Sequence, residues 1–245
     1  MPVDLAIAVG SAVVSLISVV ISGISSHRVV LLQERMQGKR EFQRYSEPLL
    51  RSADSLQSRL ANIIEGGFLT AYLHAADGSR QRYAKDNTAY VLAEFLCWVE
   101  IARRDQRFVD MGGVRANRRL FECLGRIEGT LARDDLPKPL CVFRGEQRAI
   151  GEIMIASPAH ADGHLREPLG YAAFCERLDE DPKFASWLSR LRDEISDVRT
   201  EDPDNERLVR LQHQLVELIE ILDPKQQRLR RRPRRLHRPA QGQPV

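Results

Sequence analysis

The densest group of polar side chains beside an apolar run lies in residues 143–152, which read FRGEQRAIGE. On a helix, Arg148 and Glu152 form an i, i+4 pair, and Glu146 shares a face with two apolar residues. A more apolar helix upstream supplies further charges. The candidates for a ligand pocket between the two helices are therefore Glu94, Glu100, Arg104, Glu146 and Arg148. Opposed carboxylates and guanidinium groups would bind a phosphorylated or carboxylated ligand.

The same five charges have a structural alternative, an ion-pair network that holds two helices in register. We favour this alternative, because the spacing of the residues matches no catalytic motif. The sequence also lacks a phosphate-binding P-loop, a G-x-S-x-G nucleophile elbow, an H-E-x-x-H zinc motif and the protein-kinase signatures. We therefore assign no catalytic residue and lean against an enzyme.

One loop carries three residues of types that bind metals: His160, Asp162 and His164. No Cys pair or helix-borne His stands nearby to complete a coordination sphere, so the pattern is weak evidence for a metal site. The four cysteines form no C-x-x-C pair, and their apolar surroundings are typical of reduced core thiols in the cytoplasm. The sequence predicts no metal site and no cofactor.

The stretch Leu5–Ser26 determines where all these residues lie, because it holds 22 residues without a formal charge. As a helix it would be ~33 Å long, enough to cross the ~30 Å hydrocarbon core of a bilayer. A cleaved signal peptide fits less well, since the preceding residues carry Asp4 and no Lys or Arg. The alternatives are a helix buried in a soluble core or lying in the membrane interface.

Positive charges follow this stretch closely, at Arg28, Arg35, Lys39, Arg40 and Arg44. The positive-inside rule then predicts a single-pass protein of the cell membrane, with its N-terminus outside and its domain in the cytoplasm. The domain organisation that we expect is a transmembrane anchor over residues 1–26, a juxtamembrane helix over 27–47, an all-α helical bundle over 48–224 and a disordered polybasic tail over 225–245.

Small polar residues form a stripe along the predicted membrane helix, namely Ser11, Ser15, Ser18 and Ser22. Their spacings of four, three and four place them on one face, where small side chains let two membrane helices approach closely. The same register continues beyond the membrane as Val29, Leu32 and Met36, like the seam of a coiled coil. We expect a homo-oligomer through this face. The alternative is that each serine bonds a carbonyl of its own helix.

Charge divides the chain into two parts. Eight Lys and Arg residues and no acid occupy 225–245, so a net charge of +3 for the whole chain leaves −5 for residues 1–224. The arginines that would contact anionic lipid are Arg230, Arg231, Arg232, Arg234 and Arg235. A solvated tail without a dedicated partner is the alternative. Nucleic acid is a less favoured partner, because the rest of the chain is acidic.

Periodicity predicts helices throughout the domain and no strand-rich region. The most apolar one, over Tyr90–Val99 with caps at 86–88, should lie at the centre of the bundle. Residues 140–143 read as a short strand or extended segment before a helix over 146–155. Three helices at about 170–178, 183–198 and 205–222 complete the domain, and the last two follow Asp-Pro pairs.

Several segments resemble an uncharacterised family of bacterial, especially actinobacterial, proteins. They are Tyr45 with Pro48-Leu49-Leu50, the run Leu56–Ile63, the run Tyr90–Phe95 with Trp98 and Glu100, and the run Phe143–Gly151. The resemblance covers about residues 40–224 and implies a single domain. That family has no assigned biochemical function, so the resemblance implies no catalytic residue.

These observations lead us to expect a non-enzymatic scaffold or regulatory interaction module at the cytoplasmic face of the membrane. A membrane-anchored enzyme or ligand-binding protein that uses the charged interhelical pocket is the first alternative, and a nucleic-acid binder that uses the basic tail is the second. The first two differ in a way that coordinates can test. An enzyme needs the five charges to converge on an open cavity, whereas a scaffold would have them paired and closed.

Overall fold

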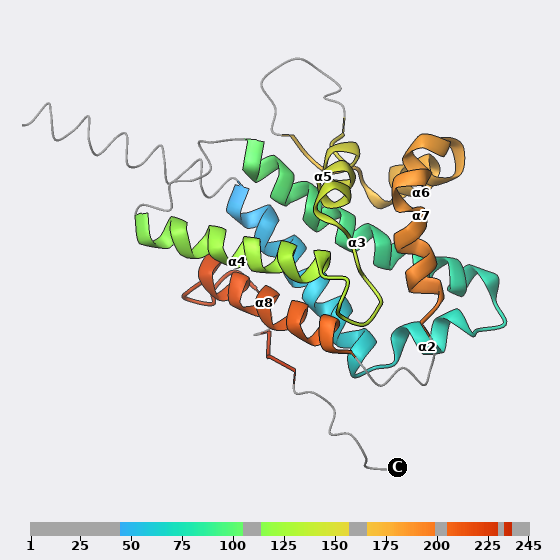
Figure 1. Cartoon of the computed structure of the whole chain (residues 1–245), viewed down its shortest axis with the longest axis horizontal. Coiled ribbons are helices and arrows are strands. Elements are labelled where there is room, and N and C mark those ends of the chain that lie inside the picture. Colours follow the sequence, from blue (N-terminus) through green and yellow to red (C-terminus); the bar gives the residue numbers. More distant parts are fainter. Residues whose placement is uncertain (1–44, 105–113, 157–165, 199–204, 230–232, 237–245) are drawn as a thin grey trace, which may run out of the picture.

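The structure is a computed structural model that describes residues 45–104, 114–156, 166–198, 205–229 and 233–236. A helix over residues 45–64 comes first. The helices that follow are α2 (Phe68–Leu73), α3 (Gly78–Arg104), α4 (Val114–Ala132), α5 (Arg144–Ile153), α6 (Tyr171–Glu180), α7 (Pro182–Ser196) and α8 (Glu206–Leu222), arranged as Figure 1 shows. Within the described ranges the only β-type pairing is one isolated bridge between Ile155 and Pro168. The predicted all-α fold is confirmed.

Several predictions concern residues that the structure does not describe. The membrane stretch Leu5–Ser26 with its serine stripe, the loop that holds His160 and His164, and Arg230 to Arg232 all lie outside the described residues. In the part of the chain that is described, no helix combines the length and the apolarity needed to cross a bilayer. The helix over residues 45–64 also runs across the predicted boundary between residues 47 and 48.

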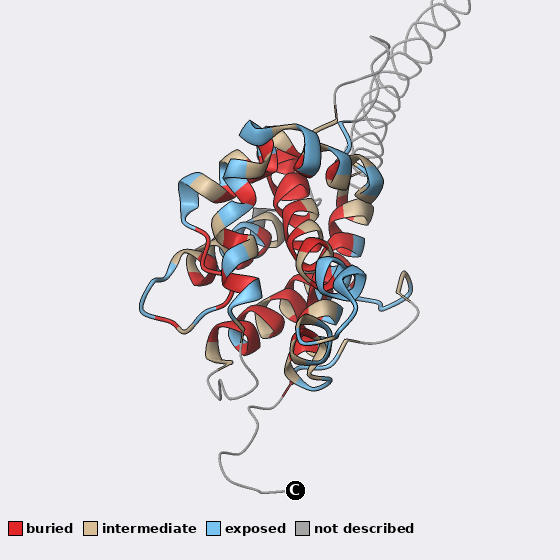
Figure 2. Cartoon of the chain, turned by 90° about the vertical axis from the view of Figure 1, so that its right-hand side faces the viewer, coloured by how far each residue is buried: buried red, intermediate tan, exposed pale blue. Residues whose placement is uncertain are grey.

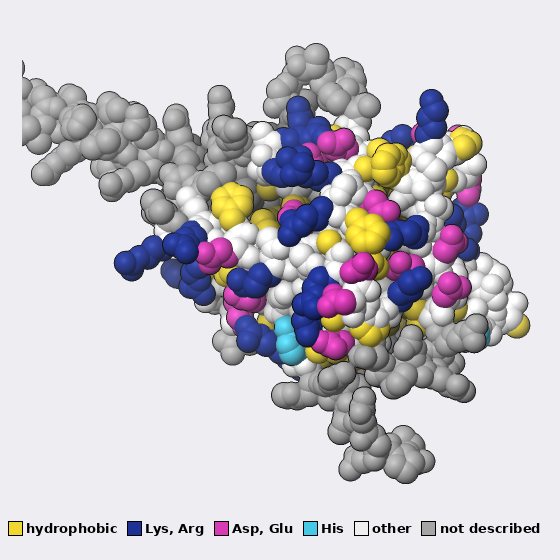
Figure 3. Space-filling view, in the orientation of Figure 1, with side chains coloured by type: hydrophobic (Ala, Val, Ile, Leu, Met, Phe, Trp, Pro, Cys, Tyr) yellow, Lys and Arg dark blue, Asp and Glu magenta, His cyan; other side chains and the backbone are white. Residues whose placement is uncertain are grey.

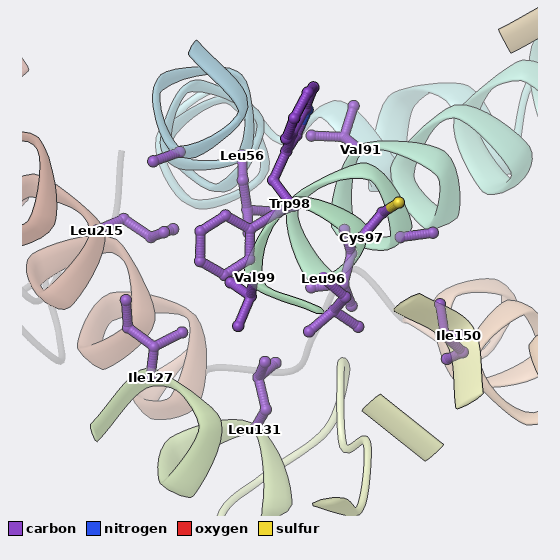
Figure 4. Packing of buried hydrophobic residues seen from close by; sticks show 14 of the residues in the cluster. Leu56, Val91, Leu96, Cys97, Trp98, Val99, Ile127, Leu131, Ile150 and Leu215 are labelled. Carbon is purple, nitrogen blue, oxygen red and sulfur yellow. The ribbon is translucent and has the colours of Figure 1, made fainter. Parts of the chain in front are cut away.

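Helix α3 lies at the centre of the bundle, as its apolar composition predicted. Its residues between Ala84 and Ala102 are mostly buried, and α2, α5, α6 and α7 all pack against it. Figure 2 shows buried residues concentrated along the central helices, and Figure 4 shows Leu96, Trp98 and Val99 pointing from α3 in different directions into the core. A helix that contacts neighbours on most of its circumference has to be apolar nearly all round.

The start of α3 differs from the prediction. The helix begins at Gly78, where Asp77 accepts a hydrogen bond from the Ser79 N–H at 2.9 Å. Asp86, expected as a helix cap, is instead fully buried inside α3. It accepts a hydrogen bond of 2.9 Å from Arg192 of α7, and its other oxygen lies 3.3 Å from Arg82. The acidic residue therefore joins two helices instead of starting one.

Helices α4 and α8 pack along each other, and a buried arginine fixes one end of this pair. Arg207, in the first turn of α8, is 1% exposed and donates to five backbone carbonyls at the end of α4 and in the following loop. They belong to Thr130 at 2.7 Å, Leu131 at 3.0 Å, Leu136 at 2.9 Å, Pro137 at 3.0 Å and Arg133. The last carbonyls of a helix have no partner within the helix and carry partial negative charge. Arg207 supplies both the missing donors and a positive charge.

Helix α5 approaches α3 at Gly151. A methyl group added there would lie 2.8 Å from the Leu96 carbonyl oxygen and 2.9 Å from Cβ of Glu100. Because one of these neighbours is backbone, the contact cannot be relieved by rotating a side chain. The absence of a side chain at Gly151 therefore sets how closely α5 lies on α3.

The chain after α8 does not leave the domain at once, so the prediction of a disordered tail is wrong for residues 225–229 and 233–236. Asp223 is buried and accepts hydrogen bonds from the N–H groups of Gln227 and Arg228, at 3.2 and 2.9 Å. Leu229 packs against the core, and Leu236 is 2% exposed. Sequence reasoning missed this because the segment has no apolar periodicity and contains only two leucines.

Gly151→Ala should destabilise the protein by about 1–3 kcal/mol, because the new methyl forces α5 away from the backbone of α3. Gly145→Ala is the matched control on the same helix, since its methyl would meet nothing within 4 Å. Alanine has the higher helix propensity, so the control should be neutral or stabilising by up to ~1 kcal/mol. Urea denaturation measures both variants, and equal stabilities would contradict the close approach.

Arg207→Met should cost about 3–5 kcal/mol, since it leaves buried carbonyls without donors while keeping a long apolar side chain. Arg210→Met is the control, because Arg210 lies on the same helix, is 46% exposed and pairs with Glu206. Its loss should stay below about 1 kcal/mol. A similarly small loss for Arg207→Met, again by urea denaturation, would mean that water can replace the guanidinium.

Candidate functional site

A hollow of about 240 Å³ lies between α3, α4 and α5. Its floor is apolar and its rim is charged, and its lining consists of Leu96, Val99, Glu100, Glu128, Arg144, Gly145, Gln147 and Arg148. Figure 3 shows basic and acidic side chains interspersed over this face of the molecule, with basic side chains gathered near α5. Two of the five predicted pocket residues, Glu100 and Arg148, line the hollow.

Glu100 is paired on its own helix. Its carboxylate is only 3% exposed and lies 2.6 Å from Arg103 and 2.5 Å from Arg104. Arg104 also reaches across to Glu152 of α5 at 2.6 Å. A buried carboxylate that already pairs with two guanidinium groups has little capacity left for a ligand. This part of the site is the ion-pair network that sequence analysis favoured.

The α5 side of the hollow is less completely paired. Arg144 lies 3.2 Å from Glu128, and both are partly exposed. Arg148 is exposed and forms no ion pair within the described part of the chain. Gln147 is 5% exposed and donates from Nε2 to the carbonyls of Glu128, at 2.9 Å, and Val142, at 2.7 Å. Its Oε1 is buried and has no hydrogen-bond partner among the described residues.

Glu146 points away from the hollow. It accepts a hydrogen bond of 2.8 Å from the Phe143 N–H, which fixes the first turn of α5, and it pairs with Arg190 of α7. Arg190 also donates to the Cys141 carbonyl at 2.9 Å. Glu194, buried on the same helix, accepts from the Cys141 N–H at 2.8 Å. These contacts hold the segment before α5 against α7. Phe143 is extended as predicted, whereas Leu140, the first residue of the predicted extended segment 140–143, has a φ of 71°.

Glu94 lies in a separate hollow of about 250 Å³ beside the start of the helix over residues 45–64. This second hollow is lined by Glu47, Pro48, Arg51, Ser52, Ser55, Glu94 and Trp98. Burial raises the pKa of Glu94, and its hydrogen bond with Tyr90 opposes that shift. Burial is also the main reason why the pKa of Tyr90 rises to about 12, with the Glu94 charge adding to it. The five predicted residues therefore do not converge on one cavity.

The cysteines are free, as predicted for reduced core thiols. Cys97, Cys123 and Cys141 are buried, and Cys175 is partly exposed. Burial raises the pKa of Cys97 to about 12 and that of Cys123 to about 11. A thiol with so high a pKa supplies almost no thiolate at neutral pH, so neither residue is suited to act as a nucleophile. Among the described residues, no group of His, Cys, Asp and Glu has the geometry of a metal site.

Sequence reasoning missed the three other polar residues of the first hollow, namely Glu128, Arg144 and Gln147. Gln147 could have been found, because it shares a helical face with Ile150, Gly151 and Met154, and an amide on a buried face needs partners. Glu128 and Arg144 gave no signal, since exposed charges on amphipathic helices are common.

Comparisons with protein-family models, with curated proteins and with solved structures found no match. The resemblance to an actinobacterial family therefore stays a prediction. What the site can do chemically follows from its geometry alone. Among the residues that the structure describes, it offers one guanidinium without an ion pair, one loosely paired guanidinium and a buried amide beside apolar side chains, and no nucleophile or acid–base pair aimed at a shared point.

Glu94→Gln should stabilise the protein more at pH 7 than at pH 4. The pKa of Glu94 in the folded state lies above its ordinary value of 4.5, so stability falls as pH rises from that value to the folded one. Glutamine keeps the shape and does not titrate. Urea denaturation at both pH values measures the difference, and Glu122→Gln, an exposed carboxylate on α4, is the control. An equal effect of Glu94→Gln at both pH values would contradict the shift.

Proposed function

We propose that this chain is a non-enzymatic interaction module, held at the cytoplasmic face of the membrane by residues 5–26 and paired with a second copy through the serine stripe. The observation that carries the proposal is the pairing of the charges that could do chemistry. Glu100 is matched by Arg103 and Arg104, and Glu146 by Arg190, while Glu94 lies in a different hollow. Charges arranged in this way hold helices together and are poorly placed to act on a substrate.

Exposed aromatic and arginine side chains support an interaction role. Phe143 is 44% exposed and Trp187 is 48% exposed. The Arg190 guanidinium lies over the Phe143 ring, 4.5 Å from its centre. Arg190 follows Trp187 by three positions on α7, so Trp187 and Arg190 project from the same side of that helix. Trp and Arg are enriched at the energetic centres of protein interfaces. This patch is where we expect a protein partner to contact the domain.

The hollow between α3, α4 and α5 supports a second candidate function, the binding of a small carboxylated or phosphorylated ligand. Arg148 is unpaired among the described residues, and Arg144 is held by Glu128 only at 3.2 Å. A ligand anion would displace Glu128 from Arg144. We rank this below the interaction role, because two carboxylates, Glu100 and Glu128, line the same hollow.

The membrane part of the proposal is tested by fractionating cells that express the full-length protein. We expect it to remain in the membrane pellet after a carbonate wash, because an apolar helix of 22 residues resists extraction. Protease should digest the domain only when it is added from the cytoplasmic side. Release by carbonate, or digestion from outside, would overturn the membrane placement.

Self-association is tested with two differently tagged copies in the same cells. The copies should co-purify in mild detergent, and Ser15→Leu combined with Ser18→Leu should reduce their co-purification several-fold by separating the two helices. Val20→Leu enlarges a side chain on the opposite face of the same segment and should leave the co-purification unchanged. If both variants behave like the wild type, the stripe does not mediate pairing.

A further inference from the structure

The segment over residues 233–236 returns along α8 and is held there through its backbone (Figure 1). Gln212, which is 0% exposed, donates from Nε2 to the Arg234 carbonyl at 2.7 Å and accepts the Leu236 N–H at Oε1 at 3.1 Å. One side-chain amide therefore engages the main chain of residues two apart. A neighbouring strand pairs with an extended peptide in the same way.

The amide of Gln212 is also held from the side of the domain. Its second N–H faces Oε1 of Gln57, on the helix over residues 45–64, at 3.3 Å. Beside it on α8, His213 donates from Nε2 to the Leu236 carbonyl at 2.5 Å. The Leu236 side chain is 2% exposed, so the domain encloses it. A buried donor–acceptor group beside an enclosed aliphatic side chain is the arrangement of a peptide-binding site.

Two carboxylates face the two arginines before Leu236. Glu65, just after the helix over residues 45–64, accepts both contacts of Arg234, at 2.8 and 3.0 Å. Glu220 of α8 lies 3.2 Å from Arg235. The carboxylates come from different elements, so together they suit a pair of successive basic residues. Both arginine side chains stay exposed, at 78% and 54%, so the pairs contribute selectivity more than affinity.

We propose that this face, made of Glu65, Gln212, His213 and Glu220, is a binding site for an extended peptide with the pattern Arg-Arg-aliphatic. Its occupant in this structure is the chain's own segment 234–236. Helix α8 packs against α4, and Gln212 bonds Gln57, so these two contacts of the site come from the domain and not from the segment. The basic tail is thereby a ligand of its own domain. This goes beyond the proposed function and does not depend on the membrane anchor.

The test removes the occupant and supplies it again as a separate molecule. A variant of the full chain that ends after residue 229, purified in detergent, is titrated into a fluorescein-labelled peptide of residues 230–241, and binding is followed by anisotropy. We expect the truncated protein to bind the peptide at least tenfold more tightly than the wild type, whose own tail competes at high effective concentration.

Receptor variants separate a built site from general charge attraction. Gln212→Ala should weaken peptide binding about tenfold, and Glu65→Gln with Glu220→Gln should weaken it several-fold. Glu65 and Glu220 are both exposed, so their replacement should leave the fold intact. The double variant therefore still tests the site if Gln212→Ala fails to fold. Glu122→Gln, which removes an exposed carboxylate of α4, should bind like the parent.

Two peptide controls complete the test. A peptide with Leu236→Ala should bind at least several-fold more weakly, and a scrambled peptide of identical composition should bind weakly at all salt concentrations. Equal binding of the scrambled and native peptides would reduce the contact to charge attraction and overturn the proposal. Equal binding of the native peptide by wild-type and truncated proteins would also overturn it. The membrane experiments are independent, so failure here leaves the proposed function standing.

Discussion

The buried guanidinium of Arg207 is the interaction on which the arrangement of the central elements depends. It has no carboxylate partner among the described residues, and its charge is balanced by the carbonyl end of α4 and the loop after it. That loop leads into the extended segment that begins α5, where the Val142 N–H bonds the Leu131 carbonyl at 2.9 Å. The position of α5 on α3 therefore depends on how the end of α4 is held. Loss of Arg207 would shift residues that line the hollow, although Arg207 does not contact it.

The sequence predicted the elements that have local signals. Asp181 caps α7 through the N–H groups of Lys183 and Phe184 with Pro182 in the first turn, and α6 and α8 lie where apolar periodicity placed them. Asp86 was misjudged because the sequence pattern is the same in two cases. An acidic residue at the edge of an apolar run can cap the start of a helix, or it can lie inside the helix and pair with an arginine of a neighbouring helix. Arg207 was missed for a different reason. Its partners are backbone carbonyls, which every residue carries, so no residue type elsewhere in the chain indicates them.

The candidate site was predicted in composition and not in geometry. Glu100 and Arg104 do belong to an ion-pair network between α3 and α5, as the sequence suggested. Glu152 pairs with Arg104 and not with Arg148, its predicted i, i+4 partner, which forms no ion pair among the described residues. Glu94 and Glu146 could not be placed, because the direction of a side chain around a helix is useful only once the neighbours of that helix are known. Glu146 faces α7, an element that nothing in the sequence of α5 points to. The buried amide of Gln147 shows that polar residues on apolar faces merit as much attention as charged ones.

The way in which Gln212 holds the chain has a consequence for how this protein can change over generations. Within the segment, the amide bonds only main-chain atoms of residues 234 and 236, so its grip does not depend on the side chains there. Selection would act on the aliphatic position, on the two basic positions that face Glu65 and Glu220 and on the receptor helix, while the rest of the tail varies. Related proteins could then share the docked strand while their C-terminal sequences align poorly.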